Sequence, residues 1–298
     1  MIHKPLDMTK KLFSILLLLC SVFNSFSEET EMDKLHKNEA ILRSTLDFIE
    51  KNDFTDSSIR KLTGNVNENS IQLGFGLQQY CDGISGGSVL VHINYVVFKE
   101  QLIKMAIIIY GYDKIKNHIG ADLQERYSKI FSRYGEYGVY YRYENDLNYE
   151  KYKSYKKEIV GECEAAVIPQ EYKKYYDCLY KVYDDCEPSA SNVYGYSIGI
   201  SGAKPDGREA MEKLLKLNDK TVFISLLKGD NPSGRIYAAE GLLRLENSKE
   251  NVDMINKIFS TLVKNDIEYP TSHGCIVTDE TYENYKYDPK RKFPEIDD

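Results

Sequence analysis

Two segments, SVLVHINYVVF (Ser88–Phe98) and LIKMAIIIYGY (Leu102–Tyr112), decide the fold of this 298-residue chain. Both are rich in β-branched and apolar residues, and only the short polar break Lys99–Gln101 separates them. This pattern is typical of a hairpin or meander that is buried on at least one face. Immediately upstream, apolar and polar residues alternate from Ser70, which predicts a further strand with one solvated face; its apolar positions are Ile71, Leu73, Phe75 and Leu77.

Weaker signals surround these strands. NEAILRSTLDFIEK (Asn38–Lys51) has apolar residues at helical spacing, which predicts an opening helix with Asn38 as its N-cap. GVYYRYEND from Gly138 and SYKKEIV from Ser154 are predicted as minor strands. The polar stretch between 113 and 137 is expected to leave the sheet as a helix or a long excursion. Residues 28–200 thus form a mixed, β-rich region.

The alternating pattern stops in the second half of the chain. Apolar residues have helical spacing in PQEYKKYYDCLYKVYDD (169–185), and a linking strand is predicted for NVYGYSIGISG (192–202). Four short amphipathic segments follow from Gly207: GREAMEKLLKL, DKTVFISLLKG, PSGRIYAAEGLLRL and NVDMINKIFSTLVKN. Asn, Asp, Gly and Pro separate these four segments, as in a run of antiparallel helices. The sequence therefore predicts an α+β protein: an N-terminal helix and antiparallel β-meander, then a helical domain over 201–278. Residues 279–298 lack an apolar period and are expected to form a flexible tail.

The pair of helices in Asp219–Leu245 resembles a single HEAT-type repeat. The first is short and apolar, the turn carries Asp230 and Pro232, and the second contains small residues, which are Ala238, Ala239 and Gly241. The chain also resembles a loose set of exported bacterial proteins of unknown function, and four segments carry this likeness: GYSIGISG, GREAMEKLL, NPSGRIYAAEGL and HGC. The likeness spans Tyr194–Val277. It implies a HEAT-like helical scaffold and no particular activity, because a continuous array needs about three repeats.

The N-terminal segment has the layout of a secretory signal peptide. Lys10 and Lys11 precede an apolar run from Leu12 to Phe23, and small residues follow up to Ser27. The run is shorter than the roughly 20 residues of a membrane-spanning helix. We therefore expect removal of 1–27 and export to the periplasm, the cell surface or the medium, with no transmembrane helix in the mature chain.

Two alternatives at this end stay open. Translation starts at Met1 or at Met8, and Met8 gives a more compact charged region. Lipidation at Cys20 would anchor the protein to a membrane, but a lipoprotein signal favours a small residue where Leu19 stands.

Composition limits the partners. The net charge is −7, and 1–27 holds three lysines against one aspartate, so the mature chain is more acidic still. Such a chain lacks the basic surface that nucleic acid or anionic lipid requires. The chain has 25 tyrosines and no tryptophan. Tyrosines supply contact area at little entropic cost, so a Tyr-rich surface can bind a partner or a small molecule.

Cysteine usage favours disulfides over metal. In an exported chain the first expectation for the five remaining cysteines is two bonds and one left over, with open connectivity; they are Cys81, Cys163, Cys178, Cys186 and Cys275. There is no C-x-x-C and no pair of histidines at ligand spacing, so neither a metal site nor a cofactor is expected.

Two motifs suggest hydrolytic chemistry. GISGG (Gly83–Gly87) matches the G-x-S-x-G nucleophile elbow, with Ser85 as nucleophile and His273 as base. The elbow requires a strand, a sharp turn and a helix, whereas an apolar strand follows Ser85, so a flexible hairpin loop is the favoured interpretation. SHGCIV brings Cys275 within two residues of His273, which allows a Cys–His dyad, although a disulfide through Cys275 is favoured.

The stretch KGDNPSGRIYAAEGLLRL (Lys228–Leu245) has an ambiguous beginning. Its glycines and Arg235 could hold a phosphate at a helix N-terminus, but Asp230 would repel an anion and no P-loop pattern is present. Asp230 or Asn231 is better explained as an N-cap. Packing does not explain Arg235, which is predicted to make a buried ion pair or a partner contact.

Three functions follow from the sequence. The favoured one is a non-enzymatic scaffold or protein-interaction protein of the cell envelope, with its partner on the helical domain. The alternatives are an envelope hydrolase that uses Ser85 or Cys275 with His273, and small-molecule binding by the Tyr-rich β region.

Overall fold

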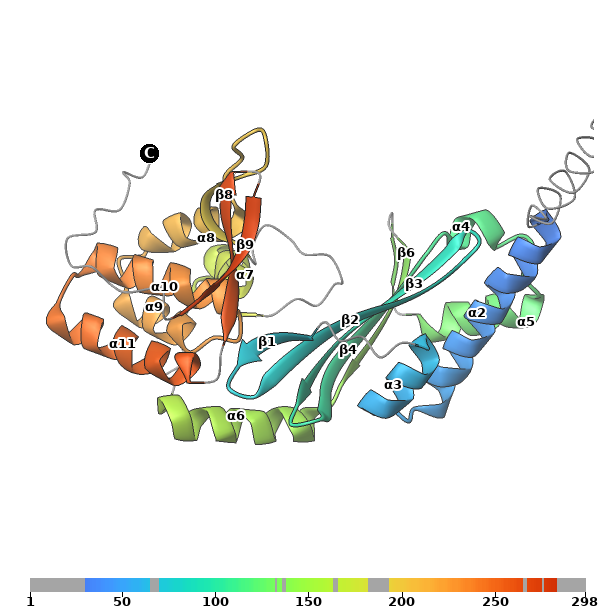
Figure 1. The fold of residues 1–298 in the computed structure, drawn as a ribbon, viewed down its shortest axis with the longest axis horizontal. Coiled ribbons are helices and arrows are strands. Elements are labelled where there is room, and N and C mark those ends of the chain that lie inside the picture. Colours follow the sequence, from blue (N-terminus) through green and yellow to red (C-terminus); the bar gives the residue numbers. More distant parts are fainter. Residues whose placement is uncertain are drawn as a thin grey trace, which may run out of the picture.

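A computed structural model describes residues 30–64, 70–131, 133–135, 138–162, 166–181, 193–264, 267–274 and 276–282. The predicted signal segment 1–27, with Cys20, lies outside these residues. Figure 1 shows an elongated molecule, in which a large sheet lies between the N-terminal helices and a C-terminal helical unit. The α+β class predicted from the sequence is confirmed: an antiparallel sheet occupies the middle of the chain, and helices precede and follow it.

The large sheet has six strands in the order β1-β2-β3-β4-β6-β5, and every neighbouring pair is antiparallel. Its strands are β1 (Ser70–Gly74), β2 (Leu77–Gly86), β3 (Val89–Phe98), β4 (Gln101–Tyr110), β5 (Arg133–Gly135) and β6 (Gly138–Glu144). The predicted hairpin is β3–β4. Its two-residue turn, Lys99–Glu100, has φ values of 49° and 65°. Positive φ at both turn residues matches the right-handed twist of the strands that they join.

Two details of the predicted strands are wrong. The alternating segment from Ser70 is two strands, because the chain turns at Phe75–Gly76, where both residues have positive φ. The segment GISGG is not a flexible loop. It belongs to β2 up to Gly86, which pairs with Val89 of β3. Strand pairing with an apolar neighbour therefore prevails over the high glycine content.

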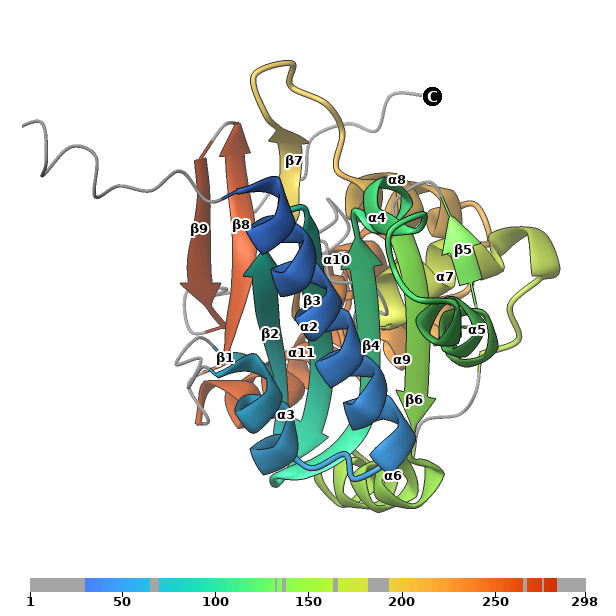
Figure 2. The same cartoon turned by 90° about the vertical axis from the view of Figure 1, so that its right-hand side faces the viewer.

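Four helices lie on the N-terminal side of the structure: α2 (Glu31–Lys51), α3 (Asp56–Thr63), α4 (Tyr112–Ile115) and α5 (Ala121–Ile130). Figure 2 shows α2 lying across one face of the sheet. The helix begins earlier than predicted, since Thr30 is its N-cap in a capping box with Asp33. Asn38 is instead buried inside α2, where its side-chain oxygen accepts hydrogen bonds from the backbone amides of Ser88 (3.1 Å) and Val89 (3.2 Å). These bonds fix the β2–β3 turn against the helix.

The segment SYKKEIV is helical rather than a strand, because it belongs to α6 (Asp146–Val160). Asn145 caps this helix by accepting a hydrogen bond from the Asn148 amide. The buried residues of α6, Tyr152 and Lys156, are four apart and lie on one face. A 3₁₀ turn (Gln170–Tyr172) leads into α7 (Lys173–Tyr180), which confirms the helix predicted from 169.

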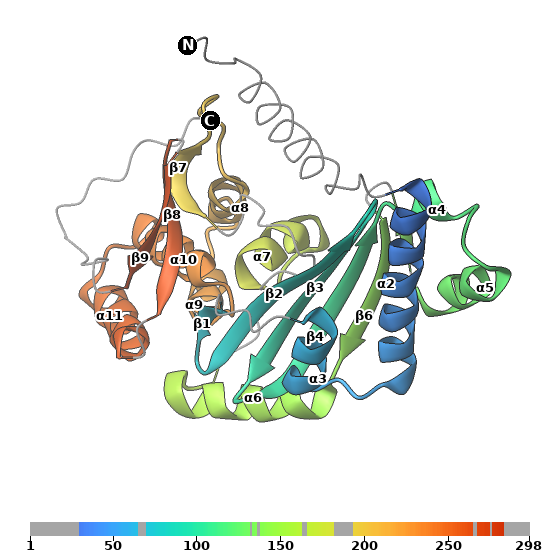
Figure 3. The ribbon, with the colours of Figure 1, turned by 45° about the vertical axis from the view of Figure 1, so that its right-hand side comes forward.

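The four predicted C-terminal helices are present as α8 (Asp206–Leu215), α9 (Lys220–Leu227), α10 (Pro232–Leu245) and α11 (Lys249–Val263). They pack with a second sheet, shown in Figure 3, of β7 (Tyr194–Ile198), β8 (Glu268–Gly274) and β9 (Ile276–Thr281). The sequence predicted β7 but neither β8 nor β9. The last three residues of β9 and the buried Tyr282 fall within the predicted tail 279–298, so the part of that tail that the structure describes is paired in a sheet and anchored by Tyr282.

One hydrophobic core joins the large sheet to the helical unit. Leu73, Phe75 and Phe98, at one end of the large sheet, share a buried cluster with Phe223 of α9 and Leu242 of α10. A second cluster lies between the sheet and α2, α3 and α5. Within the described ranges no helix is long and apolar enough to cross a membrane.

Candidate functional site

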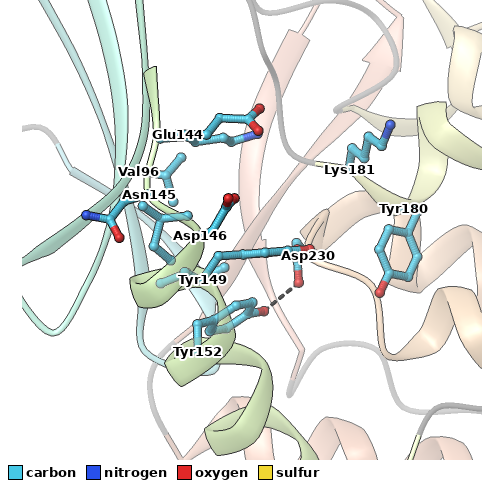
Figure 4. Close-up of a pocket in the computed structure, with 12 residues that line it drawn as sticks. Val96, Glu144, Asn145, Asp146, Tyr149, Tyr152, Tyr180, Lys181 and Asp230 are labelled. Atoms are coloured by element: carbon cyan, nitrogen blue, oxygen red, sulfur yellow. Dashed lines mark hydrogen bonds between the residues drawn. The ribbon is translucent and has the colours of Figure 1, made fainter. Parts of the chain in front are cut away.

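A cleft of about 300 Å³ opens where the large sheet meets the helical unit (Figure 4). Strands β3, β4 and β6, the start of α6, the end of α7 and the turn before α10 all contribute to it. Its lining is Leu77, Val96, Ile103, Lys104, Glu144, Asn145, Asp146, Tyr149, Tyr152, Tyr180, Lys181 and Asp230. The cleft therefore combines apolar side chains with several charged groups and tyrosines.

The β6–α6 junction forms one wall. The Asn145 amide donates to the Ile103 carbonyl (2.7 Å), and the Asn148 side chain donates to the Leu102 carbonyl (2.8 Å). These bonds hold the first turn of α6 against β4. Because that turn is fixed, Asp146 and Tyr149 are held at the cleft beside Glu144, as Figure 4 shows.

A buried ion pair lies at the base of the cleft. Asp230 Oδ1 accepts hydrogen bonds from Lys156 Nζ (2.7 Å) and from the Tyr152 hydroxyl. The Lys156 and Asp230 side chains are only 8% and 13% exposed. Burial and the adjacent Asp230 carboxylate raise the pKa of Tyr152 well above its ordinary value, so this phenol stays a hydrogen-bond donor. The Lys156 ammonium also lies 5.0 Å and 5.5 Å from the ring centroids of Tyr152 and Tyr180.

The turn before α10 holds Asp230 at the base of the cleft. The backbone amides of Asp230 (2.9 Å) and Asn231 (3.3 Å) donate to the carbonyl of Tyr180 at the end of α7. Asn231 is the N-cap of α10, since its side chain accepts from the Gly234 amide (3.0 Å). The sequence allowed either Asp230 or Asn231 as this cap, and the structure assigns it to Asn231. The Asp230 carboxylate is directed into the cleft instead.

Several polar groups at the cleft make no hydrogen bond within the described part of the chain: Asp230 Oδ2, the carboxylates of Glu144 and Asp146, and the Tyr149 hydroxyl. Burial, together with the nearby carboxylates of Asp230, Glu150 and Glu144, raises the pKa of Tyr149 to about 12. The phenol is therefore protonated at neutral pH and can donate a hydrogen bond.

Sequence reasoning did not identify this site. Lys156 was assigned to a strand, Tyr152 was left unassigned, and Asp230 was considered as a cap and as a charge that repels an anion. Their partnership joins residues 74 or more positions apart. The one available signal was the unusual density of tyrosines before α7.

The predicted hydrolytic residues lie elsewhere. Ser85 is exposed in β2 and pairs with Leu90 of β3, so strands flank it on both sides and the strand–turn–helix of a nucleophile elbow is not formed. His273 pairs with Ile276 in the three-stranded sheet, whereas Ser85 belongs to the six-stranded one. Cys275 lies outside the described residues, so its dyad with His273 stays a prediction.

The disulfide prediction is tested at one pair of cysteines. Cys81 is exposed on β2 and Cys178 is partly buried on α7, and the structure holds no disulfide between these two. Cys163, Cys186 and Cys275 lie outside the described residues. Among the residues that are described, no group of three His, Cys, Asp or Glu side chains could hold a metal ion.

Arg235 is fully buried in α10 and serves the fold. Its guanidinium donates to the backbone carbonyls of Gly229 (2.9 Å) and Leu73 (2.7 Å), and it lies 4.7 Å from the ring centroid of Phe75. No carboxylate in the described ranges is within ion-pair distance of it. The predicted ion pair or partner contact is therefore wrong, because Arg235 joins the β1–β2 turn to α10.

Two other arginines form ion pairs with a buried carboxylate in this unit. Arg208 of α8 and Arg244 both contact Glu240, at 2.5 Å and 2.7 Å, and Tyr194 donates to the other oxygen of that carboxylate at 2.9 Å. This network holds β7 and α8 against α10.

No family model matches this chain, and neither a curated protein nor a solved structure is significantly similar to it.

Proposed function

We propose that the protein binds a small polar ligand in the cleft between the large sheet and the helical unit. The observation that carries the proposal is the buried Lys156–Asp230–Tyr152 network, which presents a second, open carboxylate oxygen to the cleft. Removing an ion pair from water is expensive and often stabilises a fold less than apolar packing would. A cleft with apolar walls and a few oriented polar groups is the usual form of a ligand site, and about 300 Å³ suits a small ligand.

This proposal is related to the third function considered from the sequence, small-molecule binding by the Tyr-rich β region, but the tyrosines at the cleft belong to α6 and α7. Tyr149, Tyr152 and Tyr180 all line the cleft. We further infer that the protein acts after export, and this part rests on the signal-like pattern in 1–27 alone. The hydrolase alternative gains no support from Ser85, which lies in a continuous strand.

A cleft-filling variant tests the proposal. A thermal-shift screen of small polar metabolites against the wild type should give compounds that stabilise it by binding only the folded state. Val96→Trp places an indole in the cleft, and these compounds should no longer stabilise it. Val96 is buried, so Glu144→Trp, at an exposed position on the rim, serves as a second blocking variant. Compounds that stabilise both blocked variants as well as the wild type would contradict the proposal.

A second candidate, binding of a protein partner, is favoured by exposed apolar residues on the three-stranded sheet and in the turn after β7. Ile200, Ile276 and Val277 are 97%, 64% and 52% exposed. The pairing of Ile198 with Gly274, and of His273 with Ile276, places all three near one end of that sheet. Ile276 and Val277 fall within the proposed HEAT-like domain 201–278, and Ile200 lies directly before it. Photo-crosslinking from position 276 in intact cells should trap a defined partner, and Ile200→Asp should abolish the adduct.

A further inference from the structure

The hydrogen-bonding groups left open at the cleft are mainly acceptors. Asp230 Oδ2 lies at the base, in a residue that is 91% buried, and both oxygens of Glu144 and of Asp146 lie at the rim. None of these oxygens has a hydrogen-bond donor within the part of the chain that the structure describes. Asp230 Oδ2 is open to the cleft, and a donor on a charged group makes a stronger hydrogen bond to a carboxylate than a neutral donor does, so the base of the cleft favours a ligand that brings a cationic donor.

Carboxylates outnumber ammonium groups among the side chains that line the cleft. Three carboxylates line it, and Lys156 offsets one of them through Asp230 Oδ1. Among the lining side chains alone, these three carboxylates face Lys104 and Lys181, and Lys181 already pairs with Asp177 at 3.0 Å. The buried Arg235 donates to the Asp230 backbone carbonyl (3.3 Å) and does not line the cleft. The pKa of Tyr149, which lines the cleft, responds to this negative charge. All the charges that shift its pKa are carboxylates, and they raise it.

The protein already holds one ammonium group, that of Lys156, against the Asp230 carboxylate. Lys156 Nζ contacts Asp230 Oδ1 and lies near the rings of Tyr152 and Tyr180. Aromatic faces attract cations most strongly where water is excluded. A second ammonium at Oδ2 would meet the same carboxylate from the open side, and Glu144 and Asp146 would offset its repulsion from Lys156.

We propose that the ligand of this cleft is an organic amine that binds in its protonated form, with an ammonium group on Asp230 Oδ2 and a second polar end at Glu144 and Asp146. The inference rests on the proposed function, because it names the chemical class of ligand for the same site. A short diamine satisfies both ends, whereas an anion would meet unpaired carboxylates at each.

Three compounds with the same four-carbon chain test the class: diaminobutane, butanediol and succinate, each titrated into the full chain by calorimetry. We expect the diamine to bind and the diol and the dicarboxylate not to bind. The double variant Glu144→Gln/Asp146→Asn should weaken the diamine about tenfold or more, because it removes two charge-assisted contacts. Glu158→Gln is the matched control, since Glu158 is exposed on the same helix and does not line the cleft.

The outcomes separate the two levels of the proposal. If the diol or succinate binds as tightly as the diamine and Val96→Trp abolishes that binding, the amine class is wrong while the cleft remains the ligand site. If the diamine binds but the double variant binds it as tightly as Glu158→Gln does, the assigned contacts are wrong. If none of the three compounds binds at millimolar concentration, the amine class is overturned, and the thermal-shift screen decides the proposed function separately.

Discussion

Asp230 accepts two hydrogen bonds from buried donors, and its replacement tests how much the base of the cleft contributes to stability. Asp230→Asn leaves the Lys156 ammonium buried beside a neutral amide. Removing one partner of a buried pair typically costs about 3–5 kcal/mol. We expect a loss of this size in the free energy of unfolding, measured by urea denaturation.

Two further variants make this expectation specific. Lys204→Met is the control, because it removes a surface lysine whose side chain is 44% exposed and pairs with Glu212. It should change the free energy of unfolding by less than about 1 kcal/mol. Lys156→Met/Asp230→Leu removes both buried charges, so it should be more stable than Asp230→Asn. A double variant that is less stable than the single one would show that the pair itself, rather than the stranded charge, supports the fold.

Arg235 gives a second prediction at the scale of single residues. Arg235→Met keeps much of the side-chain volume but leaves the carbonyls of Gly229 and Leu73 without their donor. Each unsatisfied buried acceptor costs about 1–3 kcal/mol, so we expect a loss of several kcal/mol in thermal or chemical unfolding. Arg126→Met, at a surface arginine, is the control and should have little effect. Equal stability of the two variants would contradict the assigned role.

These residues also show where sequence reasoning ends. Arg235 was recognised as a residue that helix packing does not explain, but its acceptor at Leu73 lies 162 positions away. Lys156 and Asp230 lie 74 positions apart. No local pattern contains such a pairing, because it depends on how the large sheet and the helical unit meet. Single residues could therefore be marked as unusual, but their partners could not be named.

Elements were predictable where the local pattern and the tertiary contacts agree. The β3–β4 hairpin has both β-branched strands and a polar two-residue turn, and it forms as predicted. β8 was missed because Pro270 and polar residues hide its pattern. Side-chain bonds from Thr271 to the Tyr194 carbonyl (3.0 Å) and from Ser272 to the Ser197 carbonyl (2.9 Å) hold it against β7. A strand that depends on such contacts leaves little trace in its own sequence.

Close packing of α9 against α10 gives a prediction at the scale of elements. Gly241 faces Phe223 so closely that an added Cβ would lie 2.2 Å from the ring. Gly241 is one of the small residues that carry the resemblance to a HEAT-type helix pair, and here it allows α9 to lie close to α10. Gly241→Ala would normally strengthen a helix by up to about 1 kcal/mol. Here overpacking should outweigh this gain and reduce the free energy of unfolding by about 1–3 kcal/mol.

The control for this substitution is Ser260→Ala, at an exposed position of α11. It should leave the midpoint of urea denaturation almost unchanged, since it alters no packing. If Gly241→Ala is as stable as the wild type, Phe223 has moved to accommodate the methyl group, and the packing is looser than the structure indicates.

At the scale of the whole molecule, the large sheet and the helical unit share one core, and this arrangement creates the cleft. The sequence placed a boundary between 200 and 201, before the run of four amphipathic helices. Leu73 and Phe98 nevertheless pack with Phe223 and Leu242 from the other side of that boundary. Local periodicity changes at this point, but the hydrophobic core does not end there. The cleft was therefore invisible to any description that treated the two regions separately.

The buried tyrosines make stability depend on alkaline pH. Burial raises the pKa of Tyr127, Tyr152 and Tyr237 above the ordinary value of about 10, and it contributes to the value of about 12 for Tyr149. Between pH 10 and 12 the unfolded chain therefore binds fewer protons than the folded one. Stability is complete below pH 10 and falls as the pH rises.

We expect two phases when tyrosinate absorbance and circular dichroism are followed together against pH. Exposed phenols should titrate near pH 10 without loss of helix, and the buried ones should then ionise in a cooperative step together with unfolding. Tyr152→Phe, which removes one of the buried phenols, should alter the second phase. A single smooth titration near pH 10, with secondary structure intact, would mean that these phenols are open to solvent and that the two cores are far looser than the structure shows.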